Sequence, residues 1–354
     1  MQARHMDSFP ALSLKSPADM LAAIPYLFGF HPADSIVVLG LRAKRIVFQV
    51  RVDLPAPGDV GPFAKQVAAI VARQRVTRAL AAGYGSEETV TPAITALRTE
   101  LRRRRIDVPE ALRATDGQYF SYVCDNPGCC DPSGNPYDAS SSVIAATATA
   151  AGLNVVASRS DIAARLDPIG GRAAIAMRDA ALAADMRLCA LLASSDGVRN
   201  ADAVVAAGKT AVDAAILKWV HNGSLDDDDI AWLCLLLVNV TVRDYAWERV
   251  GEDLSLHADL WTYVVRRAEP ELVAPPATLL AFATWRNGGG AIATVAIDRA
   301  LAADPTYAMA QYLATAFDHG LSPTEYVELM EADEAVARSP RRGRARGRST
   351  RSRT

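Results

Sequence analysis

The chain has 354 residues, of which 50% are hydrophobic, 22% charged and 6% aromatic, and its formal net charge is −2. This composition gives room for two ordinary domains and excludes a mainly disordered protein. The longest fully apolar stretch, Ile230 to Val238, is far shorter than a membrane-spanning helix. Residues 1–15 lack the apolar core of a secretory signal. We therefore expect a globular cytoplasmic protein, without a membrane span or a disulfide scaffold.

The near-neutral total hides an uneven distribution of charge. Residues 338–354 contain eight arginines and no acidic residue, so residues 1–337 carry a formal charge of −10. Because this segment cannot bury apolar surface, we expect a disordered tail that binds polyanions such as nucleic acid through phosphate contacts. The alternative is a tail that only aids solubility. The arginines in question are Arg338, Arg341, Arg342, Arg344, Arg346, Arg348, Arg351 and Arg353.

The first half of the chain alternates between helical and strand patterns. Ser16-Pro17-Ala18-Asp19 predicts a helix start with a capping box, and Pro25 is expected to interrupt that helix. A second helix start is predicted at Thr91-Pro92. Further helices are predicted at about 62–75 and 139–151, and strands at 36–41, 46–54, 76–82, 118–123 and 153–157. This order predicts an α/β domain around one mixed sheet over residues 12–167.

After Gly171 the strand pattern stops. Asp226 to Asp229 are interpreted as a helix start rather than a metal cluster, because negative charge opposes the positive end of the helix dipole. We expect an all-α domain of helical hairpins over residues 168–337, followed by the tail at 338–354. Helices are predicted at 172–188, 203–220, 227–247, 256–267, 277–286, 291–303, 306–319 and 323–337.

The last of these helices resemble a tetratricopeptide repeat. Small, bulky, small and proline positions of that repeat are matched by Ala293, Ile297, Ala300 and Pro305. Only one such unit is visible, and a stable array needs about three. We therefore interpret this segment as helical-hairpin packing, with a peptide-binding groove as the alternative.

The run from Ser16 to Leu41, SPADMLAAIPYLFGFHPADSIVVLGL, resembles the opening of an actinobacterial family catalogued as domain of unknown function four-one-nine-two. The Cys124-x4-Cys129-Cys130 loop and the late alanine-rich helices with Asp304-Pro305 are also similar to it. The resemblance covers most of residues 12–325. It implies one recurring unit and an actinobacterial or actinophage source, and it assigns no activity and no catalytic residue.

Three cysteines, Cys124, Cys129 and Cys130, lie in a loop rich in turn-forming residues. They could hold zinc if a fourth ligand came from Asp125, Asp131, Asp138 or His31. Two of them could instead form a redox pair, or all three could stay reduced. Their spacing does not match the two separated pairs of most structural zinc sites. Cys189 and Cys234 lie in apolar helices and are expected in the core.

His31, Asp34 and Ser35 place imidazole, carboxylate and hydroxyl groups in one turn. We expect them to bond the local backbone, because side chains this close in sequence seldom converge on one point. If they form a ligand site, Arg51 and Asp53 on the polar face of the next strand are its nearest neighbours. Gly83-Tyr84-Gly85-Ser86 lacks the rest of a phosphate-binding motif and is interpreted as a strand-exit turn.

No set of residues forms a catalytic motif. Whether the protein is an enzyme, and which cofactor it uses, are therefore both left open. The favoured hypothesis is a non-enzymatic adaptor or regulatory protein, whose helical domain binds a protein partner and whose tail adds weak affinity for nucleic acid. The alternative is an enzyme, or a sensor of a small molecule or metal. Its pocket would lie in the α/β domain near His31, Asp34, Asp53 and the Cys124–Cys130 loop.

Overall fold

The computed structural model describes residues 14–193, 197–251 and 253–329. By its internal contacts the chain divides into two units, residues 1–320 and 321–354. Within the first unit, an α/β region is followed by a largely helical region. This order agrees with the sequence, whereas the boundary expected at residue 167 stays a prediction. The arginine-rich tail lies outside the described residues.

The α/β region is built on one mixed sheet. Its strand order is β2-β1-β3-β4-β5-β6, and only β3 and β4 run parallel. The predicted mixed sheet is therefore confirmed. The strands are β1 (Ser35–Arg42), β2 (Arg45–Asp53), β3 (Arg78–Tyr84), β4 (Asp107–Thr115), β5 (Gln118–Ser121) and β6 (Asn135–Pro136).

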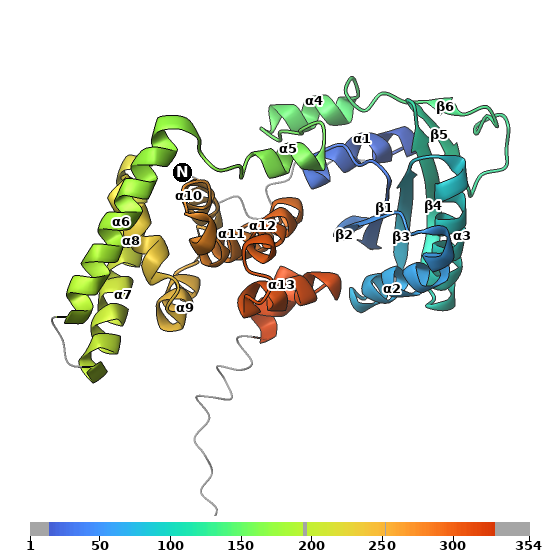
Figure 1. The fold of residues 1–354 in the computed structure, drawn as a ribbon. Coiled ribbons are helices and arrows are strands. Elements are labelled where there is room, and N and C mark those ends of the chain that lie inside the picture. Colours follow the sequence, from blue (N-terminus) through green and yellow to red (C-terminus); the bar gives the residue numbers. More distant parts are fainter. Residues whose placement is uncertain (1–13, 194–196, 252, 330–354) are drawn as a thin grey trace, which may run out of the picture. The chain divides into compact units, whose positions relative to one another are not determined.

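Helices cover both faces of this sheet (Figure 1). On one face, α2 (Val60–Arg73) and α3 (Glu87–Arg103) pack against Ile36 and Val38 of β1. On the other face, α1 (Pro17–Phe28) packs against Val37 and Leu39. Burial on both faces explains why β1 is almost continuously apolar, as predicted.

Two helix boundaries differ from the prediction because of proline. Ser16 and Asp19 form the predicted capping box of α1, but the helix continues past Pro25 to Phe28. Proline removes its own N–H bond and crowds the carbonyl four residues earlier, but the bonds that follow it can still form, and the Pro25 carbonyl accepts from the Gly29 N–H at 2.7 Å. Likewise, α3 starts at Glu87, where the Ser86 hydroxyl caps the helix, and it contains Pro92. The predicted start at Thr91-Pro92 was wrong.

The sheet also differs from the prediction at three places, one of which is the short strand β6, which was not predicted. The strand expected at 153–157 is reduced to a single bridge, in which Val156 pairs with Phe30. β4 was not predicted, because Glu110 and Arg113 interrupt its apolar pattern. Tertiary contacts accommodate Arg113, which lies 3.9 Å over the Phe120 ring and pairs with Glu87. Helices α4 (Val143–Ala150) and α5 (Arg159–Ala164) follow the sheet.

The helical region begins at Gly171. The single helix expected at 227–247 is two helices, because the Asn239 side chain accepts the N–H groups of Thr241 and Val242 and caps the second. Residues 323–329 are also helical. The named helices are α6 (Gly171–Ala193), α7 (Gly197–Asn222), α8 (Asp227–Leu236), α9 (Val240–Glu248), α10 (Leu254–Val265), α11 (Ala274–Arg286), α12 (Gly290–Ala303) and α13 (Ala308–Asp318).

The interior of this region centres on α11, which is buried from Ala274 to Trp285. The ring of Phe282 stacks on Trp247 of α9 with centroids 3.6 Å apart. The tetratricopeptide-like packing of the last helices stays a prediction. Among the described residues, no single helix is long and apolar enough to cross a membrane. The pair α8 and α9 passes on length and composition, although it is bent by 113°.

Candidate functional site

A pocket of about 290 Å³ lies at the end of the sheet where β3 and β4 finish; we call it the sheet-end pocket. Ligands of open α/β sheets bind at this carboxyl end of parallel strands. Its apolar wall includes Leu21 and Pro25 of α1. The polar side chains of the lining are His31, Asp34, Tyr84, Thr115, Asp116 and Tyr137.

Strand register brings these distant residues together. Ser35 at the start of β1 pairs with Tyr84 at the end of β3, so the loop carrying His31 and Asp34 lies beside Tyr84. Tyr84 in turn pairs with Ala114 near the end of β4. The turn that follows contributes Asp116. The pocket therefore forms only when all three strands are paired.

Tight turns fix the two carboxylates on the pocket rim. Asp34 has φ 44°, and its carbonyl accepts the Leu54 N–H at 3.0 Å. Asp116 and Gly117 have φ 49° and 74° and connect β4 to β5 in a two-residue hairpin, a turn for which Asp-Gly is a preferred pair. Both aspartates are exposed. The rim therefore presents two negative charges that the backbone holds in place.

Tyr84 is the least satisfied polar residue of the lining. Its side chain is buried, and its hydroxyl has no hydrogen-bond partner among the described residues. Burial, aided by Tyr137, raises the pKa of Tyr84 well above its ordinary value. The phenol is therefore neutral and able to donate. A buried hydroxyl without a partner is costly, so a ligand that accepts from it would gain affinity.

Arg51 and Asp53, the other two residues expected near His31 and Asp34, do not line the sheet-end pocket. Arg51 donates to the Ala33 carbonyl at 3.0 Å and pairs with Asp53 at 2.5 Å. Arg51 thus supports the loop that carries Asp34, and Asp53 lies on the neighbouring strand β2. The structure brings His31 and Asp34 together with Tyr84 and the Gly85 turn. It does not bring Arg51 or Asp53 into the pocket.

The three clustered cysteines form a second feature of the α/β region. The Sγ atoms of Cys124 and Cys129 are 3.0 Å apart, and those of Cys129 and Cys130 are 3.8 Å apart. All three sulfur atoms lie within 4.8 Å of one another. We call residues 122–134, which connect β5 to β6, the cysteine loop.

The thiols of this loop affect one another's protonation. The Cys129 thiol, together with the Asn126 backbone N–H, lowers the pKa of Cys124 by hydrogen bonding. The bond to Cys124 raises the pKa of Cys129, and it raises that of Cys130 to about 12 with help from burial. The first proton therefore leaves Cys124, and hydrogen bonding to that sulfur holds the protons of the other two thiols.

None of the carboxylates or imidazoles in the described ranges joins the three sulfurs closely enough to complete a metal site. Among the predicted fourth ligands, Asp131 and Asp138 accept from nearby serines, and His31 lines the sheet-end pocket. Cys234 is buried as predicted. Cys189 is exposed, so its expected core position was wrong: it lies on the face of α6 away from the packed side.

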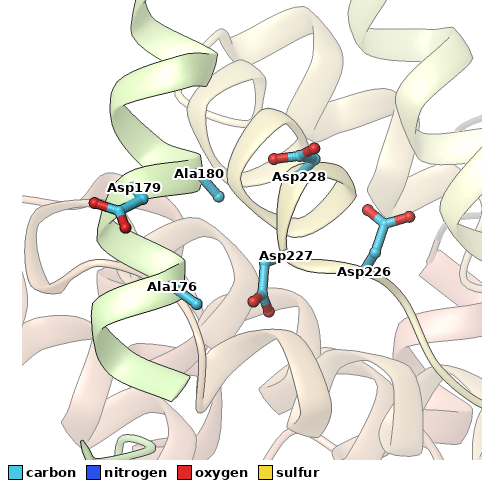
Figure 2. Close-up of a pocket in the computed structure, with 6 residues that line it drawn as sticks. All are labelled: Ala176, Asp179, Ala180, Asp226, Asp227 and Asp228. Carbon is cyan, nitrogen blue, oxygen red and sulfur yellow. The ribbon is translucent and has the colours of Figure 1, made fainter. Parts of the chain in front are cut away.

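A hollow of about 400 Å³ lies between α6 and the start of α8 and is lined by Asp179 and Asp226 to Asp228. Figure 2 shows that these carboxylates point in different directions. Asp226 caps α8 by accepting the Asp229 N–H at 2.8 Å, and Lys218 bonds both Asp226 and Asp229. The predicted helix start is confirmed.

A family model described as Domain of unknown function (DUF4192) matches residues 17–324. The chain belongs to this family. The resemblance carried by Ser16 to Leu41 and by the cysteine loop is thereby confirmed. No curated protein and no solved structure matches the chain. In this DUF4192 chain, the sheet-end pocket and the cysteine loop are therefore identified from their own geometry.

Sequence reasoning missed Tyr84, Asp116 and Tyr137 as pocket residues. The signals were present, because Gly83-Tyr84-Gly85 and Asp116-Gly117 both mark the ends of strands. The sequence does not reveal how β1, β3 and β4 pair, and that pairing places the ends of β3 and β4 beside the loop of His31 and Asp34.

Proposed function

We propose that the α/β region binds a small polar molecule with a positively charged group in the sheet-end pocket. The observation that carries this proposal is the partnerless hydroxyl of Tyr84, buried in the lining of a pocket rimmed by Asp34 and Asp116. A bound acceptor would satisfy the phenol, and an ammonium or guanidinium group would neutralise the rim.

The charges near the pocket favour a cation over an anion. Asp34 and Asp116 line the pocket and are exposed, and Glu87 and Glu88 occupy the first turn of the helix that follows Gly85. Because Glu87 is paired with Arg113, the carboxylates that oppose a phosphate here are those of Asp34, Asp116 and Glu88, even though a helix begins there. The volume of about 290 Å³ suits a compact ligand, since it is at the low end for small-molecule sites.

Thermal unfolding of the full chain with a panel of small amines tests this proposal. The panel contains arginine and lysine, whose carboxylates can accept from Tyr84, and putrescine and spermidine as cations without an acceptor, while inorganic phosphate and AMP serve as anionic comparisons. We expect at least one amine to raise the melting temperature of the wild type, because a ligand that binds only the folded state stabilises it. Failure of every amine, or stabilisation by the anions only, would overturn it.

A matched pair of variants locates the binding. Asp34→Asn removes a rim carboxylate, and Asp53→Asn makes the same change in charge on β2, outside the pocket. Asp34→Asn is expected to lose most of the stabilisation by the amine, and Asp53→Asn to keep it. Equal losses would show that the amine responds to overall charge rather than to the pocket.

A second candidate function is the non-enzymatic adaptor, which one feature of α6 favours. Ile175, Leu182 and Met186 are 52%, 63% and 68% exposed and lie at spacings of seven and four residues, so they share one helix face. The opposite face of α6 is packed through Met177, Ala180 and Ala184. We propose that this exposed stripe contacts an amphipathic helix of a protein partner.

Two experiments separate the parts of the adaptor hypothesis. Leu182→Asp is expected to abolish co-purification of a partner without unfolding the chain, and retained co-purification contradicts the role of α6.

Deleting residues 338–354 is expected to abolish retention on DNA or RNA at low salt. Unchanged retention would remove the tail from the hypothesis. The cytoplasmic location expected from the sequence remains a prediction.

A further inference from the structure

The cysteine loop gathers three thiols from a short stretch of chain without using any of them in a disulfide. Cys124, Cys129 and Cys130 are all free, and their sulfurs lie within 4.8 Å of one another. Cys129 is exposed and the other two are partly exposed. The cluster is therefore open to solvent on at least one side, and an ion could enter it without rearrangement of the sheet.

The backbone N–H groups of the three cysteines are held by bonds to oxygen atoms rather than to thiols. The Ser121 hydroxyl accepts the N–H groups of Val123 and Cys124, each at 3.1 Å. The Asn126 carbonyl accepts the N–H groups of Cys129 and Cys130 at 3.1 and 2.8 Å. The positions of all three cysteines are thus fixed by the strand end and by one tight turn. Such preorganisation reduces the entropy lost when a ligand orders the side chains.

The other end of the loop is closed by Gly134. This residue has φ 101°, and a Cβ there would lie 2.5 Å from the Gln118 Oε1 and 2.9 Å from the Phe120 ring. Next to it, β6 pairs with β5 through Asn135 and Tyr119. The loop is therefore anchored to the sheet on both sides.

The spacing of one sulfur pair matches metal coordination, whereas the 3.0 Å between Cys124 and Cys129 is about equally far from coordination and from a disulfide bond. Metal–thiolate bonds of about 2.3 Å at tetrahedral or trigonal angles place sulfurs roughly 3.8–4.0 Å apart. Cys129 and Cys130 already have this separation, and Cys124 needs to move from Cys129 by about 1 Å. A disulfide would engage two sulfurs and leave the third unused, whereas a metal ion uses all three.

We propose that Cys124, Cys129 and Cys130 form a three-coordinate site for a soft, thiolate-seeking cation, Cu(I). Three sulfurs and no fourth ligand among the described residues favour a cation that accepts trigonal sulfur coordination. Zn(II) ordinarily takes four ligands and would need one from outside the cluster. Binding replaces thiol protons by the metal, and those protons go to solvent.

The charges around the cluster are consistent with this assignment. Each thiolate that binds contributes a negative charge, which the cation neutralises. The half-buried Glu110 adds further negative charge nearby, although burial raises its pKa. Copper binding is therefore expected to weaken as the pH falls, because protons compete for the same sulfurs.

The test is an anaerobic Cu(I) titration of the reduced full chain in competition with bathocuproine disulfonate. We expect one equivalent of Cu(I) to be withheld from the chelator. Cys124→Ser, Cys129→Ser and Cys130→Ser should each lower the affinity by at least about 10-fold. Cys189→Ser is the matched control, because Cys189 is an exposed thiol on α6, and its affinity should equal that of the wild type.

Circular dichroism melts of each variant show whether a loss of copper comes from unfolding. Serine is close in size to cysteine and the backbone N–H groups of the three cysteines bond to oxygen atoms rather than to thiols, so the melts are expected to agree with the wild type. Equal copper affinity in the wild type and in any one of the three loop variants would overturn the three-sulfur site. Tighter binding of Zn(II) than of Cu(I), or formation of a Cys124–Cys129 disulfide with no copper bound, would also overturn the proposal.

Discussion

The two regions of the chain differ in where their unpartnered polar groups lie. Within the described ranges, both contain buried polar atoms without a hydrogen-bond partner, but the Tyr84 hydroxyl belongs to a residue that lines the sheet-end pocket, whereas His257 Nδ1 and Trp261 Nε1 lie on the buried side of α10. In the helical region, carboxylates serve other protein groups: Asp226 caps α8, and Asp213 accepts from Tyr245 and Arg249 at 2.8 and 2.6 Å. In the α/β region, the Tyr84 hydroxyl has no partner among the described residues, and three thiols lie together without a disulfide. Both of these features lie at loops that follow strands.

This difference indicates where binding chemistry resides. Polar groups that already have protein partners stabilise the fold, and those without partners are available to a ligand. The helical region therefore functions as a packed body, and α6 carries an exposed apolar stripe. The α/β region provides a rigid sheet that holds reactive or donor groups at its edge. Variants of each region should consequently have separable effects.

The largest expected effect is in the core of the helical region. Phe282→Ala removes the ring that stacks on Trp247 and leaves a cavity in the buried face of α11. We expect the free energy of unfolding to fall by about 3–5 kcal/mol. Chemical denaturation monitored by tryptophan fluorescence measures the change. A loss below about 1 kcal/mol would show that α11 is not the centre of this core.

Gly134→Ala should affect the α/β region instead. The added Cβ meets Gln118 and Phe120, and the positive φ is unfavourable for alanine, so we expect a loss of about 1–3 kcal/mol. Because the cysteine loop is closed by this residue, Cu(I) affinity should fall as well. Gly128→Ala lies in the same loop without positive φ and is the control. Equal effects of both substitutions would contradict the anchoring role of Gly134.

Loss of a helix cap should produce a smaller change. Asp226→Ala removes the acceptor for the Asp229 N–H, and we expect a loss of about 1 kcal/mol. Asp228→Ala removes an equal charge from the first turn of α8 and leaves the cap in place, so the loss of stability should be smaller. Thermal unfolding compares the two variants. A larger loss in Asp228→Ala would mean that charge, rather than capping, determines stability at this helix start.

The smallest expected effect is a dependence of stability on pH through His257. Burial lowers the pKa of this imidazole from its ordinary 6.5, and Asp253 partly opposes the shift. The unfolded chain therefore binds the proton first, so stability should fall as the pH drops below about 6.5. His257→Gln should reduce the difference in melting temperature between pH 7 and pH 5. The same acid dependence in both proteins would exclude His257 as its source.

Features set by neighbouring residues could be predicted from the sequence. Ser16, Pro17 and Asp19 fix the start of α1 through contacts within one turn, and the apolar run of β1 reports burial on both faces. By contrast, β4 contains Glu110 and Arg113, whose partners come from distant segments. A pattern of period two cannot reveal a strand whose charges are accommodated by tertiary contacts.

The candidate site shows the same limit. His31 and Asp34 were noticed because they lie in one turn, and the three cysteines because they cluster in sequence. Tyr84 and Asp116 join the pocket only through the pairing of β1, β3 and β4. Arg51 and Asp53, which the alternating pattern put on the polar face of β2, pair with each other outside the pocket.

The proposed ligand pocket is tested most directly by Tyr84→Phe, assayed by calorimetric titration with the amine that stabilises the wild type. Because this change removes only a hydroxyl without a partner, the free chain should be as stable as the wild type or more so. We predict that the affinity for the amine nevertheless falls, by about 10-fold for a lost hydrogen bond of roughly 1.4 kcal/mol. Undiminished affinity in a folded Tyr84→Phe variant would contradict the account.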